Sequence, residues 1–236
     1  MDGKVKEEVN RLIHEKRVVD ASHVLHIVNG QALYDVFKNE SVLDYSHLIP
    51  FNEAMCVNET TESISSPAFI QMRAKGHNSS VDAYKKLVTD YLEPLQKEQY
   101  AFIYLWFGED MFCQINVLTL LAYLEQIGYG GSVQLNVFDE KEFQVETVDI
   151  MLGNYERVYR EVLVHHEASS EDTYPLMNRA VGIYLELLTE PNRITEYIKK
   201  NRELSDKDLL QKLFKKFDYI GYGDSQYMDL IKEISS

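Results

Sequence analysis

The sequence predicts an α/β fold: a parallel, Rossmann-like, doubly wound sheet in the N-terminal half, followed by a mainly α-helical C-terminal half. In residues 23–140, short β-rich apolar runs alternate with stretches of helical periodicity. One run, AFIYLWFG at residues 101–108, is eight residues long and uncharged, as expected of a central strand covered on both faces. After about residue 150 the strand signals vanish and helical patterns continue.

The elements of the first half are expected as follows. Residues 5–13 fit a short leading helix, 24–28 a strand, 32–37 a helix and 47–51 a second strand. Residues 56–80 are rich in Ser, Thr, Asn and Glu and read as a long connection. Ser79, with Asp82 three residues later, fits the cap of a helix that runs through Leu92 and ends near Pro94.

The second half of the sheet and the helical region follow. Residues 109–127 fit a strongly apolar helix that stops at Gly128, and residues 132–138 a strand. Helices are then expected over 155–166, over 176–189 after Pro175, over 191–200, over 209–216 after a capping box at Ser205, and near the C-terminus. We therefore expect an α/β domain over residues 1–145 and a helical region over 146–236 packed on it.

Composition excludes some classes of function. The 236 residues are 45% hydrophobic and 26% charged, a profile typical of a globular protein, and the net charge is −14. Most of the surface of so acidic a chain repels the phosphate backbone of nucleic acid, which argues against nucleic acid as a partner. No apolar run approaches a membrane span, the N-terminus lacks the apolar core of a signal peptide, and the two cysteines suggest no disulfide framework. These observations predict a cytoplasmic protein.

Charge is unevenly distributed along the chain. Residues 191–216 carry four acidic groups against eight basic ones: Arg193, Lys199, Lys200, Arg202, Lys207, Lys212, Lys215 and Lys216. Lysines on amphipathic helices usually form a solvated face. The alternative interpretation is a docking surface for an acidic partner.

Polar residues follow the predicted strands, at the sheet edge where ligands of open parallel sheets bind. They fall in four segments: Asn29-Gly30-Gln31, Asn52-Glu53, Gly108-Glu109-Asp110 and Asp139-Glu140. Gly30 permits a close backbone approach, and free amides at the next helix start suit an anion. A simple tight turn at Asn29-Gly30 is the alternative.

Three further residues have two interpretations each. Asp110 and Gln114 share one face of a first helical turn, where Asp110 is either a helix cap or a ligand contact beside Gln114. Trp106 is either core or a stacking wall of the site. Glu53 is either a solvated acid after a turn or a functional residue, as a general base or a ligand anchor.

Two other patterns do not indicate a functional site. His165 and His166 are adjacent on a predicted helix and point about 100° apart, so they do not suit one metal ion. Residues 221–227 resemble the turn of a helix-turn-helix, but the helix after them is too acidic for the major groove. The sequence identifies no metal site, cofactor or oligomeric state.

Three motifs, HVLHIVNGQAL, PFNEAMC and YLWFGEDMFCQINVLTLLAYL, together resemble a bacterial family catalogued as domain of unknown function 1835. The resemblance covers residues 23–140, and the helical remainder is similar to the companion region of that family. It implies the same α/β fold and site positions at Asn29, Gly30, Glu53 and Asp110. The chain departs from the family pattern at Phe51-Asn52 and at Gly108-Glu109. The family brings no established activity.

Two hypotheses of function follow. In the first, an anionic or nucleotide-like small molecule binds, or reacts, at the carboxyl edge of the sheet. Glu53 and Asp110 would be the catalytic residues, and Asn29, Gly30, Gln31, Trp106 and Gln114 would bind the ligand. In the second, a regulatory or interaction protein docks a partner through its basic C-terminal helices. Some family members are labelled as transcription regulators, a label to which the acidity of this chain adds little support.

Overall fold

The computed structural model describes residues 23–39, 47–97, 100–139 and 144–235, and the single residues Glu7 and Arg11. The helix expected over residues 5–13 therefore lies outside the described residues. In chain order the elements are β1 (Val24–Asn29), α2 (Gly30–Asn39), β2 (His47–Phe51), α3 (Pro67–Gly76), α4 (Val81–Tyr84), the π-helical turn η2 (Lys85–Thr89), α5 (Asp90–Leu92), α6 (Pro94–Lys97), β3 (Phe102–Gly108), α7 (Met111–Gln126), β4 (Ser132–Asp139), β5 (Gln144–Ile150), α8 (Tyr155–Tyr159), the π-helical turn η3 (Arg160–Val164), α9 (Pro175–Leu187), α10 (Arg193–Lys200), α11 (Asp206–Lys216), the 3₁₀ turn η4 (Asp218–Ile220) and α12 (Asp224–Ser235).

The strands form one five-stranded sheet in the order β2-β1-β3-β4-β5. The first four strands are parallel, and β5 runs antiparallel to β4. The predicted α/β fold, with its mainly parallel sheet in the N-terminal half and helices after it, is confirmed. The expected domain boundary at residue 145 falls inside β5, so the sheet continues to Ile150.

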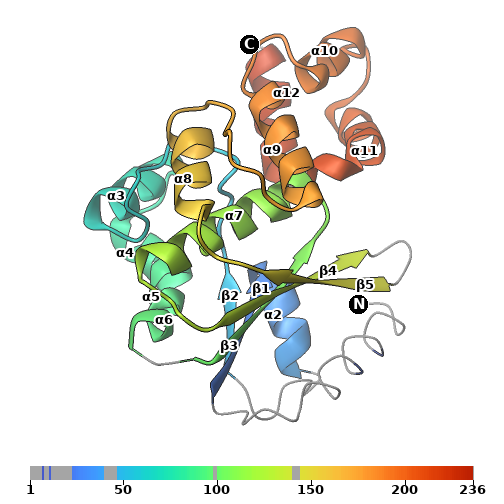
Figure 1. The fold of residues 1–236 in the computed structure, drawn as a ribbon. Coiled ribbons are helices and arrows are strands. Elements are labelled where there is room, and N and C mark those ends of the chain that lie inside the picture. Colours follow the sequence, from blue (N-terminus) through green and yellow to red (C-terminus); the bar gives the residue numbers. More distant parts are fainter. Residues whose placement is uncertain are drawn as a thin grey trace.

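Helices cover both faces of this sheet (Figure 1). Alternate residues of a strand point to opposite faces. Val28 and Trp106 pack against Phe37 of α2, whereas Ile27 and Leu105 belong to the larger core that contains α7. The connections that leave β1 and β3 therefore cross the sheet on opposite sides.

Helix α7 lies at the centre of the molecule (Figure 1). Its residues from Met111 to Leu124 are buried except Phe112, so it lacks the polar face of a surface helix. The sheet packs on one side of α7, and α8 and α9 pack on the other. The C-terminal helices thus form an additional layer that covers the connection between β3 and β4.

Three local expectations are wrong. The connection expected over residues 56–80 contains α3, which begins after the N-cap Ser66 and carries Pro67 in its first turn. Ser80, not Ser79, caps α4, because its hydroxyl accepts a hydrogen bond from the amide of Ala83. The fifth strand, β5, falls where the sequence indicated only a join between the two halves.

Candidate functional site

The carboxyl ends of β1 and β3 lie side by side near the middle of the sheet. Their connections leave on opposite faces, through Gly30 into α2 and through Asp110 into α7. This is the topological switch point, where ligands bind in open α/β sheets. The fold therefore sets the place of a candidate site before any side chain is considered.

Asp110 caps α7 at this point. Its backbone is extended, with φ −69° and ψ 162°, and its Oδ1 accepts a hydrogen bond of 2.8 Å from the amide of Cys113. Burial raises the pKa of Asp110, although hydrogen bonds from Cys113 oppose that effect. Asp110 is thus both a helix cap and a partly exposed carboxyl group with an elevated proton affinity.

Asn29, the last residue of β1, bonds to two side chains of α7. Its Nδ2 donates to the Sγ atom of Cys113 at 3.1 Å, and its Oδ1 accepts from Nδ2 of Asn116 at 3.3 Å. Asn116 also donates to the carbonyl of Glu53 at 2.7 Å and accepts from the amide of Met55 at 3.0 Å. Residues Asn29, Glu53 and Asp110, far apart in sequence, therefore belong to one hydrogen-bonded cluster anchored on α7.

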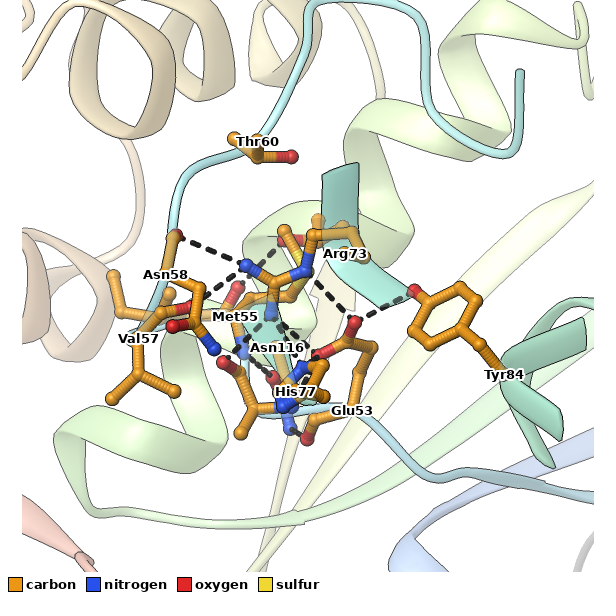
Figure 2. A network of polar contacts seen from close by, with 12 residues as sticks. Glu53, Met55, Val57, Asn58, Thr60, Arg73, His77, Tyr84 and Asn116 are labelled. Atoms are coloured by element: carbon orange, nitrogen blue, oxygen red, sulfur yellow. Dashed lines mark hydrogen bonds and ion pairs between the residues drawn. The ribbon is translucent and has the colours of Figure 1, made fainter. Parts of the chain in front are cut away.

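The side chain of Glu53 is fully buried and accepts five hydrogen bonds (Figure 2). Its Oε1 accepts from Nε of Arg73 at 2.9 Å and from the hydroxyl of Tyr84 at 2.6 Å. Its Oε2 accepts from Nη2 of Arg73 at 2.7 Å and from the amide of Ala54 at 2.6 Å, and lies 3.1 Å from Nε2 of His77.

These contacts determine the charge of Glu53. Burial alone would raise the pKa of its carboxyl group, but hydrogen bonds from His77 and Arg73 outweigh burial and lower the pKa to about 2. Glu53 is therefore ionised at neutral pH. A carboxylate with so low a pKa is a poor general base, because efficient bases have pKa values near the working pH.

Arg73, which sequence reasoning missed, organises the loop after β2. Its Nη1 donates to the carbonyl groups of Val57, Asn58 and Glu59, and its Nη2 donates to the carbonyl of Ala54 (Figure 2). Its guanidinium is fully buried against Glu53, and the expected connection over residues 56–80 gave no reason to single it out. The ion pair thus holds the loop that carries Glu53 in one conformation.

Two of the predicted ligand contacts, Trp106 and Gln114, have buried side chains. Trp106 is 1% exposed on the α2 face, where its Nε1 donates to Nδ1 of His26 at 2.9 Å, so it is core. Gln114 is completely buried, donating to the carbonyl of Gly108 and accepting from the hydroxyl of Tyr174. Both side chains therefore form hydrogen bonds within the protein.

The other predicted positions differ in access. Gly30 has φ +78°, so the turn requires the left-handed conformation that glycine adopts without strain. Gln31 is exposed and bonds to Asp35 and to Asn52. Of the last predicted segment, Glu140 and the side chain of Asp139 lie outside the described residues.

The C-terminal region covers one side of Asp110. Gly221 has φ +77°, and a Cβ atom added there would overlap the Asp110 carboxylate. This turn joins η4 to α12, and η4 packs on α7. The helical half therefore contributes one wall of the surroundings of Asp110, which sequence spacing did not reveal.

Some chemistries are not supported here. Both cysteines are free, and burial raises the pKa of each thiol, with Asp110 adding to the effect, so neither suits a nucleophile at neutral pH. Within the described part of the chain no three His, Cys, Asp or Glu side chains converge as metal ligands. No helix in the same part combines the length and apolar character needed to cross a bilayer.

Comparisons with family models, curated proteins and solved structures found no match. The interpretation of the site therefore rests on its geometry.

Proposed function

We propose that the protein binds a small polar molecule, anionic or nucleotide-like, at the switch point between β1 and β3. The observation that carries this proposal is the position of two residues: Asn29 ends β1, Asp110 follows the end of the neighbouring strand β3, and both bond to Cys113. We further propose that residues 23–140 belong to domain of unknown function 1835, a membership that would imply the same residues.

Each group has a role in this proposal. The backbone at Gly30 opens α2, whose first turn contains no acidic residue, so its free amides suit an anionic group. The Asp110 carboxyl group, with its raised pKa, would hold a polar or cationic part of the ligand and exchange a proton if a reaction occurs. Glu53 would support the site through its backbone carbonyl and the ion pair with Arg73.

A screen for thermal stabilisation by phosphate, nucleotides and small carboxylates tests the proposal. The informative variant is Asp110→Asn, because Asn caps helices as well as Asp does and so removes the charge without removing the cap. Asp110→Asn should abolish the rise in Tm caused by a ligand, whereas Asp229→Asn, on an exposed part of α12, should not. A rise in Tm that survives in both Asp110→Asn and Asn29→Ala would refute it, and so would a panel without any stabilising compound.

The second candidate function, docking through the basic helices, has a weaker basis. Arg193 bonds to Glu186 and Tyr219, Lys200 pairs with Glu196, and Lys216 lies over the ring of Tyr197. Much of the positive charge of residues 191–216 is thus used within the helical region. Reversing the charge of Lys212 and Lys215 would abolish binding of an acidic partner if this surface docks one.

A further inference from the structure

His77 is the accessible member of the Glu53 cluster. Its side chain is 28% exposed, whereas those of Glu53 and Arg73 are fully buried. Its ring stacks on Tyr84, with centroids 6.2 Å apart and planes 13° from parallel. One ring atom, Nε2, lies 3.1 Å from both Oε2 of Glu53 and Nη2 of Arg73.

The ionised carboxylate of Glu53 identifies the tautomer of this ring. A carboxylate can only accept hydrogen bonds, so the 3.1 Å contact between Oε2 of Glu53 and Nε2 of His77 requires a proton on Nε2. The contacts of Nη2 of Arg73 with Oε2 of Glu53 at 2.7 Å and with the carbonyl of Ala54 at 3.0 Å agree with this assignment, since they occupy both of its protons. The neutral ring therefore carries its proton on Nε2 and a lone pair on Nδ1.

That lone pair has no hydrogen-bond partner among the residues that the structure describes. A carboxylate that accepts the N–H proton of one imidazole nitrogen fixes the ring orientation and leaves the other nitrogen as the acceptor. The buried carboxylate, the donated Nε2 proton and the free Nδ1 together form the arrangement of an acid–base dyad.

We propose that His77 is a proton-transfer residue whose Nδ1 accepts the proton of a hydroxyl group on a small polar molecule, with Glu53 as its positioning residue. The hydroxyl O–H bond breaks, the proton moves to Nδ1, and the electron pair remains on the oxygen of the molecule. The ring becomes an imidazolium whose Nε2 proton still points to Glu53.

The proposed base is therefore His77 and not Glu53, the residue that the sequence favoured. Glu53 is ionised, saturated with donors and inaccessible, so it cannot take a proton from a ligand without breaking the loop structure. The inference goes beyond the proposed ligand site at the switch point, because it concerns the end of β2 and requires no ligand between β1 and β3.

Acylation of the intact protein by diethyl pyrocarbonate tests the proposal, with peptide mapping by mass spectrometry to measure each histidine separately. The imidazole lone pair attacks a carbonyl carbon of the reagent and expels ethyl carbonate, which takes up the proton that the other ring nitrogen loses and breaks down to ethanol and carbon dioxide. His165 is an internal control, since its side chain is 49% exposed and its nearest carboxylate oxygen, on Glu62, is 4.0 Å away. If His77 has only a structural role, it should react more slowly than His165, because its side chain is less exposed.

We expect His77 to react at least about threefold faster than His165, because the carboxylate makes Nδ1 more nucleophilic. Glu53→Gln should reduce the rate of His77 to that of His165 or below, whereas Glu62→Gln should leave it unchanged. A rate for His77 below that of His165 in the natural protein would overturn the proposal. If Glu53→Gln does not fold, ¹⁵N NMR of the natural protein still decides: a proton on Nδ1 of neutral His77 refutes the dyad, and a proton on Nε2 supports it.

Discussion

Two glycines with nearly identical backbone conformations allow the packing of the C-terminal half on Asp110 to be measured. Gly30 has φ +78° and Gly221 has φ +77°, so alanine meets the same backbone strain at both positions. A methyl group at position 30 meets no atom within 4 Å, whereas one at position 221 overlaps the carboxylate of Asp110. Any difference between the two substitutions therefore reports the contact between Gly221 and Asp110.

The magnitudes follow from these two environments. A left-handed conformation costs an alanine about 1–2 kcal/mol, which is the expected loss of unfolding free energy for Gly30→Ala. Overpacking adds about 1–3 kcal/mol, so Gly221→Ala should cost about 2–5 kcal/mol. Urea unfolding followed by circular dichroism at 222 nm measures both values.

A double-mutant cycle identifies the contact responsible. Asp110→Ala removes the overlapping oxygens and leaves a Cβ atom 3.0 Å from the new methyl group. In that background the cost of Gly221→Ala should fall to about 1–2 kcal/mol, the cost of the backbone conformation alone. Equal costs for Gly30→Ala and Gly221→Ala, or a cost of Gly221→Ala unaffected by Asp110→Ala, would show that the turn does not pack on Asp110.

The remaining predictions concern the buried ion pair. Because the pKa of Glu53 is lowered from 4.5 to about 2, its carboxylate contributes about 3 kcal/mol above pH 4.5, and this contribution is lost as pH falls toward 2. Urea midpoints measured between pH 5 and pH 3 should decline accordingly, and a protein whose stability is constant over that range would contradict the assignment. Arg73→Lys should cost about 3–5 kcal/mol, because an ammonium group cannot replace five N–H donors and leaves buried acceptors unpaired. Arg193→Lys, at an ion pair with a half-exposed arginine, should cost less than about 1 kcal/mol, and similar losses for the two variants would refute the structural role of Arg73.

The sequence predicted the parts of the fold that are apolar on all sides. Residues 101–108 and 109–127 lack charge or carry little of it because β3 and α7 are buried on nearly every side. By contrast, β5 has the sequence QVETVDI and pairs on one edge only. Its Glu146, Thr147 and Asp149 are exposed, so the segment lacks the apolar run by which the other strands were recognised. Helix α3 was not predicted because its buried face is not purely apolar. Its buried residues include the charged Arg73, whose partners lie in the loop after β2.

Only those residues of the candidate site that follow the ends of strands could be predicted from the sequence. Asn29, Glu53 and Asp110 follow buried strands, and parallel strands bring such residues to one edge of the sheet. Trp106 and Gln114 are adjacent in sequence to that edge, but the register of β3 and the rotation of α7 direct both side chains into the protein interior. His77 gave no periodic signal, because its position depends on how α3 packs against the loop after β2.

The fluorescence of the single tryptophan, Trp106, reports on the packing of α2 against the sheet. The indole of Trp106 packs against Phe37 on the α2 face, whereas Asn29, Cys113 and Asp110 cluster at the start of α7 on the other face. Its emission should therefore be that of a shielded fluorophore and should shift to longer wavelength when α2 detaches from the strands. Comparing that shift with the loss of helical signal would show whether the two layers unfold in one step or in sequence.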